Sequence, residues 1–263
     1  MRIIRDVIVA RGSDTRSFLH SQLSNDIEPM AVGASRYSFV LEPTGKLSAL
    51  LRVRCIAHDH FVLDVDEGCG GPAVARLNKF KIRVKCEFQL SSRHVIALRG
   101  LSAATRDDAL TQPGAVAAWR EGDGAVDVFD GDPAPSADLP TYHAERVRCG
   151  WPMFGVDIDT DTIPAETSLI DVCVSFTKGC YPGQELVERM DSRGSTAPRR
   201  LMRLPARPAN NDGGATGSTT AVVGAPYVWN GRAIGQCTSV AGDFALVMVT
   251  RAHLGDAEAL VRS

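Results

Sequence analysis

The sequence predicts an α+β protein that ends in a small β-rich part. Residues from Ile82 to Leu90 alternate between apolar and polar types, which is typical of a strand with one buried face. Gly12-Ser13-Asp14 can cap a helix that continues to Leu23 and carries apolar residues along one stripe. Asn230-Gly231, between two strand-like runs, predicts a tight hairpin near the C-terminus.

Most of the other predicted elements are strands separated by polar or Gly/Pro-rich turns. A turn at 43–46 separates the second strand from the third, and Asp59 marks the next reversal. Short helices are expected at 72–80 and 184–190. Residues 205–217 form a predicted linker, and the part that follows it is expected to be all-β. The predicted strands are residues 7–10, 37–41, 47–56, 61–65, 82–90, 94–98, 126–129, 227–229, 233–240 and 244–249.

The composition is that of a globular protein, with 44% hydrophobic and 23% charged residues among 263 and a net charge of −2. This charge does not favour wholesale coating of nucleic acid. No apolar run is long enough for a membrane span, and the N-terminus is too polar for a signal peptide. Seven scattered cysteines without a CxxC pair argue against a disulfide framework or a structural zinc site and indicate a cytoplasmic location. Neither a P-loop nor a GxGxxG after a strand occurs.

The most informative segment is residues 178–185, Lys-Gly-Cys-Tyr-Pro-Gly-Gln-Glu, called the signature below. It places Cys180 between two glycines and just before a predicted helix, where nearby Lys178 and free backbone N–H groups favour a thiolate. Cys180 is therefore the candidate nucleophile or metal ligand. The structural alternative is an ordinary loop cysteine. Gly179 and Gly183 permit close backbone approach, Gln184 and Glu185 can cap the helix, and Tyr181 either lines a cavity or packs in the core.

The signature resembles that of the YgfZ family, relatives of the glycine-cleavage aminomethyltransferase (T-protein) whose mitochondrial members are iron–sulfur assembly factors. Four further segments are similar to the family pattern, namely residues 18–27, 41–47, 163–166 and 231–239. The resemblance implies two intertwined α+β subdomains with antiparallel sheets around a central, folate-sized cavity over residues 1–200. It also implies a small C-terminal β-barrel over residues 201–263. The expected cofactor is tetrahydrofolate, with Tyr181, Gln184, Glu185 and the two signature glycines as candidate cavity residues and Cys180 at the rim.

Two positions depart from the aminomethyltransferase pattern. The acid that the enzymes carry in the helix after the fourth predicted strand falls near Ala73, and Asp66 and Glu67 are the nearest carboxylates. Arg148 stands where the enzymes have a glutamate that contacts the pterin, and an arginine cannot accept hydrogen bonds. Aminomethyl transfer is therefore not favoured, and the expectation of folate binding is weakened.

The sequence thus predicts an accessory factor for the assembly or repair of iron–sulfur proteins and, through them, for tRNA modification. Its partners would be transient client or assembly proteins and a folate, with no membrane and no tightly bound metal. Cys180 is a possible cluster ligand, but a single thiol would need further ligands from elsewhere. Two alternatives stay open. One is a folate-dependent one-carbon transferase; the other is a tRNA-binding module that uses the arginines between Arg189 and Arg207.

Overall fold

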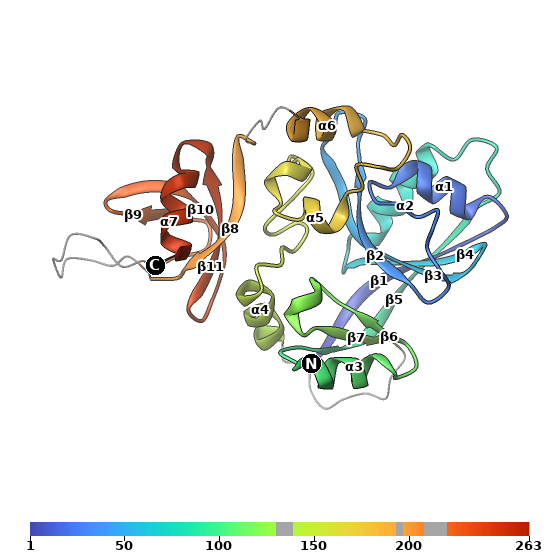
Figure 1. The fold of residues 1–263 in the computed structure, drawn as a ribbon, viewed down its shortest axis with the longest axis horizontal. Coiled ribbons are helices and arrows are strands. Elements are labelled where there is room, and N and C mark those ends of the chain that lie inside the picture. Colours follow the sequence, from blue (N-terminus) through green and yellow to red (C-terminus); the bar gives the residue numbers. More distant parts are fainter. Residues whose placement is uncertain (130–138, 193–196, 208–219, 263) are drawn as a thin grey trace.

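The computed structural model describes residues 1–129, 139–192, 197–207 and 220–262. These residues form two antiparallel sheets, connected by the segment that carries the signature (Figure 1). In this part of the chain, no helix combines the length and the apolar character that a membrane crossing requires. The segment 208–219, which holds most of the predicted linker, lies outside the described residues.

The first sheet has seven strands in the order β2-β3-β4-β1-β5-β7-β6. Strand β1 pairs with β4 on one side and with β5 on the other, so the N-terminal strand lies in the middle of the sheet. Six of these strands were predicted at least in part, and β6 was not. The strands are β1 (Arg2–Arg11), β2 (Ser35–Leu41), β3 (Leu47–Ala57), β4 (His60–Asp66), β5 (Glu87–Leu98), β6 (Ala115–Ala117) and β7 (Val126–Phe129).

Two helices cover one face of this sheet. Phe18 and Leu19 of α1 (Thr15–Gln22) and Leu77 of α2 (Gly70–Lys79) bury their side chains against strand residues such as Ile8 and Leu51. The predicted apolar stripe of the first helix is therefore confirmed. Further helices follow as α3 (Ala103–Leu110), α4 (Leu139–Arg148), the short α5 (Ile170–Cys173) and α6 (Gln184–Ser192).

The predicted strand over 82–90 is wrong in its first half. The strand begins at Glu87 and continues without a break to Leu98, which merges two predicted strands. Glu87 pairs with Arg11, the last residue of β1, so the preceding residues have no partner strand. They are held instead at the start of α1, where the Lys85 N–H donates to Asp14 Oδ2 at 2.8 Å. Ile82 is consequently 77% exposed.

The second sheet has the strand order β8-β11-β10-β9, with β8 and β9 as its outer strands. The hairpin at Asn230-Gly231 is confirmed, because both residues adopt the positive φ angles of 48° and 73° that its turn requires. The closing part is not all-β: helix α7 (Leu254–Arg262) packs on the sheet through Leu254, Ala257 and Leu260. The strands are β8 (Arg199–Pro205), β9 (Pro226–Trp229), β10 (Arg232–Ala241) and β11 (Phe244–Thr250). The expected barrel closure stays a prediction.

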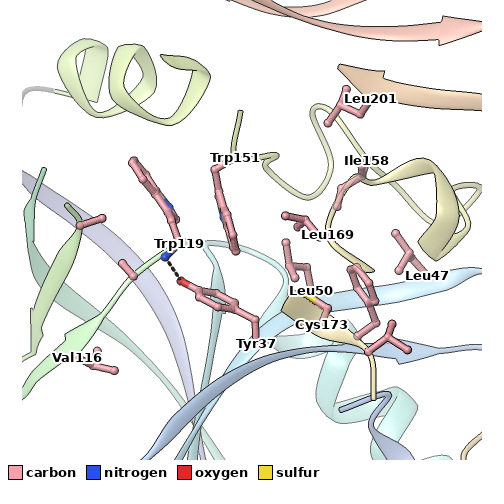
Figure 2. Packing of buried hydrophobic residues seen from close by; sticks show 14 of the residues in the cluster. Tyr37, Leu47, Leu50, Val116, Trp119, Trp151, Ile158, Leu169, Cys173 and Leu201 are labelled. Atoms are coloured by element: carbon pink, nitrogen blue, oxygen red, sulfur yellow. Dashed lines mark hydrogen bonds between the residues drawn. The ribbon is translucent and has the colours of Figure 1, made fainter. Parts of the chain in front are cut away.

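A continuous apolar cluster fills the space between the two sheets (Figure 2). It combines Tyr37 and Leu50 of the first sheet with Trp119, Trp151 and, from the second sheet, Leu201. The rings of Tyr37 and Trp151 lie 4.6 Å apart, and the Trp119 backbone N–H donates to the Tyr37 hydroxyl at 3.1 Å. Large aromatic side chains pack closely in this part of the interior. The expected folate-sized central cavity stays a prediction.

Candidate functional site

The signature connects α5 to α6 and presents its cysteine to solvent. All seven cysteines are free, four are buried, and Cys180 is the exposed one. Helix α6 begins at Gln184, as predicted, so the thiol precedes the first helical turn by a few residues. Cys180 is thus accessible to a partner or reagent, which is the first requirement for a reactive thiol. Its chemical role stays a prediction.

Lys178 is buried, and its ammonium is bound by backbone carbonyls at the end of α1. It donates to the carbonyl of His20 and to those of Leu23 and Asn25, at 2.6 and 3.2 Å for the last two. Burial lowers the pKa of Lys178 to about 8. These contacts give the lysine a structural role, since it ties the signature to the C-terminal end of α1 where the helix dipole favours a cation.

Gly183 lies directly against the turn that follows β2. Its φ angle is 84°, and a β-carbon built on it would be 2.7 Å from the Glu42 carbonyl oxygen. In the same contact, a β-carbon on Gly45 would be 2.6 Å from Leu186 of α6. The predicted close approach is confirmed at Gly183. Gly179 differs, because a β-carbon there would meet only His20 Nε2, at 3.9 Å.

The remaining signature residues have local structural contacts. Tyr181 is 7% exposed and belongs to the central apolar cluster, and burial raises its pKa to about 12. The Gln184 side chain accepts from the Tyr181 backbone N–H at 3.3 Å, which matches the predicted role at the helix start. Glu185 is exposed in the first helical turn, where a carboxylate is favoured by the helix dipole.

An acid–histidine pair lies beside the signature. His20 Nδ1 is 3.2 Å from Asp26 Oδ1, and His20 Nε2 faces Gly179, the residue before Cys180. The sequence alone did not single out His20. The pairing is hard to find from sequence, because α1 ends and the chain turns between the two residues. The only local signal was that both fall in the family-like segment 18–27.

A cavity of 440 Å³ opens beside α4, at the start of β1. The start of β1, the β4–α2 turn, α4 and the segment 153–156 form its walls. Asp66 and Glu67, the acids identified from sequence, both line it, and Asp66 pairs with Arg5 and accepts from the Phe154 N–H at 3.1 Å. Cys180 is not among the residues that line this cavity, and its expected place at the rim of a folate cavity stays a prediction.

The two positions that depart from the enzyme pattern are away from this cavity's lining. Ala73 is fully buried in the apolar cluster beneath α1 and α2. Arg148 points to solvent and donates to Glu145 Oε2 at 2.8 Å. Its neighbour Arg146 is the buried residue, which binds Asp157 at 2.6 Å and Ser239 of β10 at 2.8 Å.

The arginines proposed for tRNA contact are largely engaged within the protein. Arg199 pairs with Glu166 at 3.0 Å, and Arg200 pairs with Glu258 at 2.5 Å. Arg203 donates to the Arg148 carbonyl and lies over the Phe244 ring. Arg193 lies outside the described residues. These pairings support a structural role for the arginines of this stretch. Across the described ranges, no three His, Cys, Asp or Glu side chains gather as a metal site.

A solved structure with a similar fold identifies the fold of this chain. No protein-family model matches the chain. The glycine cleavage system aminomethyltransferase T from Bartonella henselae superposes with a TM-score of 0.72 at 19% identity, covering 95% of this chain and 79% of that one. The molecule therefore has the fold of the aminomethyltransferase T-proteins.

The sequence relatives narrow this class. The tRNA-modifying protein YgfZ of two Vibrio vulnificus strains, CMCP6 and YJ016, is 25% identical over 218 residues, which cover 75% of this chain and 67% of each relative. An uncharacterized protein of Haemophilus influenzae is also 25% identical, over 191 residues. The resemblance to the YgfZ family is thus confirmed within the T-protein fold.

Proposed function

We propose that this chain is a YgfZ-like accessory factor that serves iron–sulfur proteins through the Cys180 thiol, and that its clients include enzymes that modify tRNA. The relatives named tRNA-modifying protein YgfZ support the class of process. The observation that carries the proposal is the exposure of Cys180 in a signature loop whose other residues anchor it to α1 and to the turn after β2.

The contacts on both sides of Cys180 hold the loop in place while the thiol itself stays exposed. On one side, the Lys178 ammonium binds the Leu23 carbonyl at the end of α1. On the other side, Gly183 packs against the backbone of Glu42. Cys180 lies between these two points with its side chain free in solvent. A thiolate there can serve as one ligand for iron in transit, and the remaining ligands would come from the client protein or a small thiol.

Tetrahydrofolate is the cofactor that the family resemblance implies, and the 440 Å³ cavity is the place where the chain's residues fit it. Ile3, Met153 and Phe154 offer apolar walls to a flat ring. Asp66 is already engaged by Arg5 and the Phe154 N–H, so Glu67 is the acid that could accept pterin N–H donors. Calorimetric titration with tetrahydrofolate should show binding that Glu67→Gln weakens.

The alternative of a one-carbon transferase loses support from Ala73, which offers no acid and lies in an apolar cluster. The alternative of a tRNA-binding module loses support from the arginine pairings. Filter binding of tRNA at increasing salt distinguishes it, because direct phosphate contacts would give a steep salt dependence. A function in the cytoplasm remains part of the proposal.

The test replaces the thiol and spares the fold. Cys180→Ser removes one sulfur from an exposed position, so the variant should unfold at the wild-type temperature. In a strain that lacks its own factor, it should fail to restore the activity of an iron–sulfur tRNA-modifying enzyme. Cys149→Ser, at a half-buried cysteine of α4's C-terminal side, is the control and should restore it. Full rescue by Cys180→Ser would remove the thiol from the mechanism.

A further inference from the structure

A buried arginine fixes which ring nitrogen of His143 carries the proton. The Arg146 Nε–H donates to His143 Nδ1 at 3.1 Å. Arg146 is 4% exposed and also binds Asp157 and Ser239, at 2.6 and 2.8 Å, so its guanidinium is held in place. A guanidinium has only donors and stays protonated in proteins. Nδ1 is therefore the accepting nitrogen of His143, and the proton of the neutral ring lies on Nε2.

This Nε2–H group belongs to a residue that lines the 440 Å³ cavity. Arg146 is not a lining residue, so the ring nitrogen that faces it is directed away from a ligand, and Nε2 is the nitrogen left for one. Burial and the Arg146 cation lower the pKa of His143 from its ordinary value of 6.5, while Asp157 and Asp66 oppose that shift. The ring therefore stays neutral at neutral pH and keeps one donor and one acceptor.

Most other polar side chains of the cavity lining are already engaged or uncharged. Arg5 is bound by two carboxylates of β4, and one of them, Asp66, also accepts from the Phe154 N–H. Burial raises the pKa of the Cys69 thiol to about 11, so it is uncharged at neutral pH. Glu67 is exposed and offers a carboxylate that can only accept.

The start of α2, at the same end of the cavity, is not open to an anion. The backbone N–H groups of Gly68 and Gly70 both donate to Asp6 Oδ2, each at 3.0 Å. These donors are the ones that an anionic ligand would use at a helix N-terminus. The chemistry that the cavity offers is thus a fixed donor at His143, an acceptor at Glu67 and apolar walls.

We propose that the cavity recognises the lactam edge of a fused heterocycle, with the ring carbonyl accepting from His143 Nε2–H and the adjacent ring N–H donating to Glu67. This inference rests on the proposed binding of a folate here, because a pterin carries such a carbonyl and N–H side by side. His143 is then the residue that sets specificity, and Arg146 positions it. An amino group in place of the carbonyl would bring two donors together and leave both unsatisfied, which a polar site rejects.

The experiment compares two ligands that differ at this one position. Folic acid carries the ring carbonyl, and aminopterin carries an amino group in its place. Calorimetric titration gives the Kd of each ligand, and the quantity of interest is the aminopterin value divided by the folic acid value. His143→Phe keeps a ring of similar size but has no donor. It should lower this ratio by about fivefold, the effect of losing one hydrogen bond of about 1 kcal/mol.

Two matched variants show that the change is specific. Leu139→Ala removes an apolar contact at the cavity wall, so it should weaken both ligands alike and leave the ratio unchanged. His143→Gln has an amide that can accept from Arg146 and still donate, so it should retain most of the wild-type ratio. The same ratio in wild type and His143→Phe would overturn the inference.

The tautomer can be read in the wild type, which covers the case in which His143→Phe does not fold. Nitrogen-15 NMR should show His143 protonated at Nε2 and not at Nδ1, and the Nε2 signal should shift when folic acid is added. A proton on Nδ1, or an Nε2 signal that folic acid leaves in place, would overturn the inference. Folic acid binding without this response would leave the folate cavity standing. Absence of folic acid binding would contradict the cavity and the inference together, but not the role of Cys180.

Discussion

At the scale of single residues, Lys178 shows how a signature residue can act on the fold instead of on the chemistry. A lysine beside a cysteine suggests a cation that stabilises a thiolate. The structure directs this ammonium to three carbonyls at the end of α1 instead. The residue types of the signature thus divide between a solvent-exposed thiol and contacts that fix the loop.

Replacing Lys178 by Met should destabilise the protein by about 1–3 kcal/mol, because the carbonyls of His20, Leu23 and Asn25 lose their buried donor. Urea unfolding at neutral pH measures the loss. Lys46→Met is the matched control. Lys46 makes an exposed pair with Asp161, so its removal should cost well under about 1 kcal/mol. Equal stabilities of the two variants would contradict the structural role of Lys178.

The same lysine predicts a pH dependence. Its pKa is lowered from 10.5 to about 8 in the folded protein, so the unfolded chain holds the proton more tightly. Stability rises with pH wherever the unfolded state binds more protons. The wild type should therefore gain stability relative to Lys178→Met as the pH increases from 8 to 10.5. A constant difference across this range would show that the ammonium is not desolvated.

At the scale of elements, the turn after β2 and the start of α6 fit together through two glycines. Gly45 and Gly183 both have positive φ angles, and each meets the other element at a distance that a side chain would not allow. Two segments of sequence that resemble the YgfZ family pattern separately are therefore one contact in space. This contact fixes the C-terminal side of the thiol loop.

Gly183→Ala should destabilise the protein by about 2 kcal/mol, through its positive φ angle and its clash with the Glu42 carbonyl. Gly179→Ala is a control within the same loop, since its β-carbon would have no contact closer than 3.9 Å, and it should change stability by less than about 0.5 kcal/mol. Thermal unfolding of both variants makes the comparison. A Gly183→Ala protein as stable as Gly179→Ala would show that the close approach is not needed.

Elements that are determined by neighbouring residues in the sequence could be predicted. Features that depend on residues far away in the sequence could not. The hairpin at Asn230-Gly231 follows from turn chemistry within the hairpin itself. The strand predicted from Ile82 failed because alternation does not reveal where the partner strand ends. Helix α7 was missed although Leu254, Ala257 and Leu260 lie three residues apart. The His20–Asp26 pair and the absence of Cys180 from the cavity lining both depend on tertiary structure, which spacing along the chain does not encode.

At the scale of the whole molecule, a buried ionic network lies beside the aromatic cluster in the first sheet. Arg52 bridges Asp64 and Asp127, at 3.0 and 2.9 Å, and Arg99 also pairs with Asp127, at 2.6 Å. Burial raises the pKa of Asp127, but the two arginines outweigh it and lower the value to about 2. The network joins β3 and β4 to β7, so it connects both halves of the sheet.

Asp127→Asn should destabilise the protein by about 3 kcal/mol at neutral pH, because the buried Arg99 side chain loses its ion pair and Arg52 keeps only its pair with Asp64. The folded pKa lies below the unfolded value of 3.8, so the stabilisation is present above pH 3.8 and is lost as the pH falls towards 2. Urea unfolding of wild type and variant from neutral to acidic pH measures their free energies of unfolding. The difference between these free energies should become smaller as the pH falls from 3.8 towards 2. Asp107→Asn, in an exposed pair with Arg106, is the control.

The central claim is that Cys180 is a thiol prepared for reaction, and its alkylation rate tests that claim most directly. The measurement is the rate constant of Cys180 in the wild-type protein with iodoacetamide near pH 7, set beside that of glutathione under the same conditions. The account predicts that Cys180 reacts several-fold faster, since the loop presents it just before the first turn of α6, whose free N–H groups favour an anion. A rate equal to that of glutathione, or lower, would contradict the account.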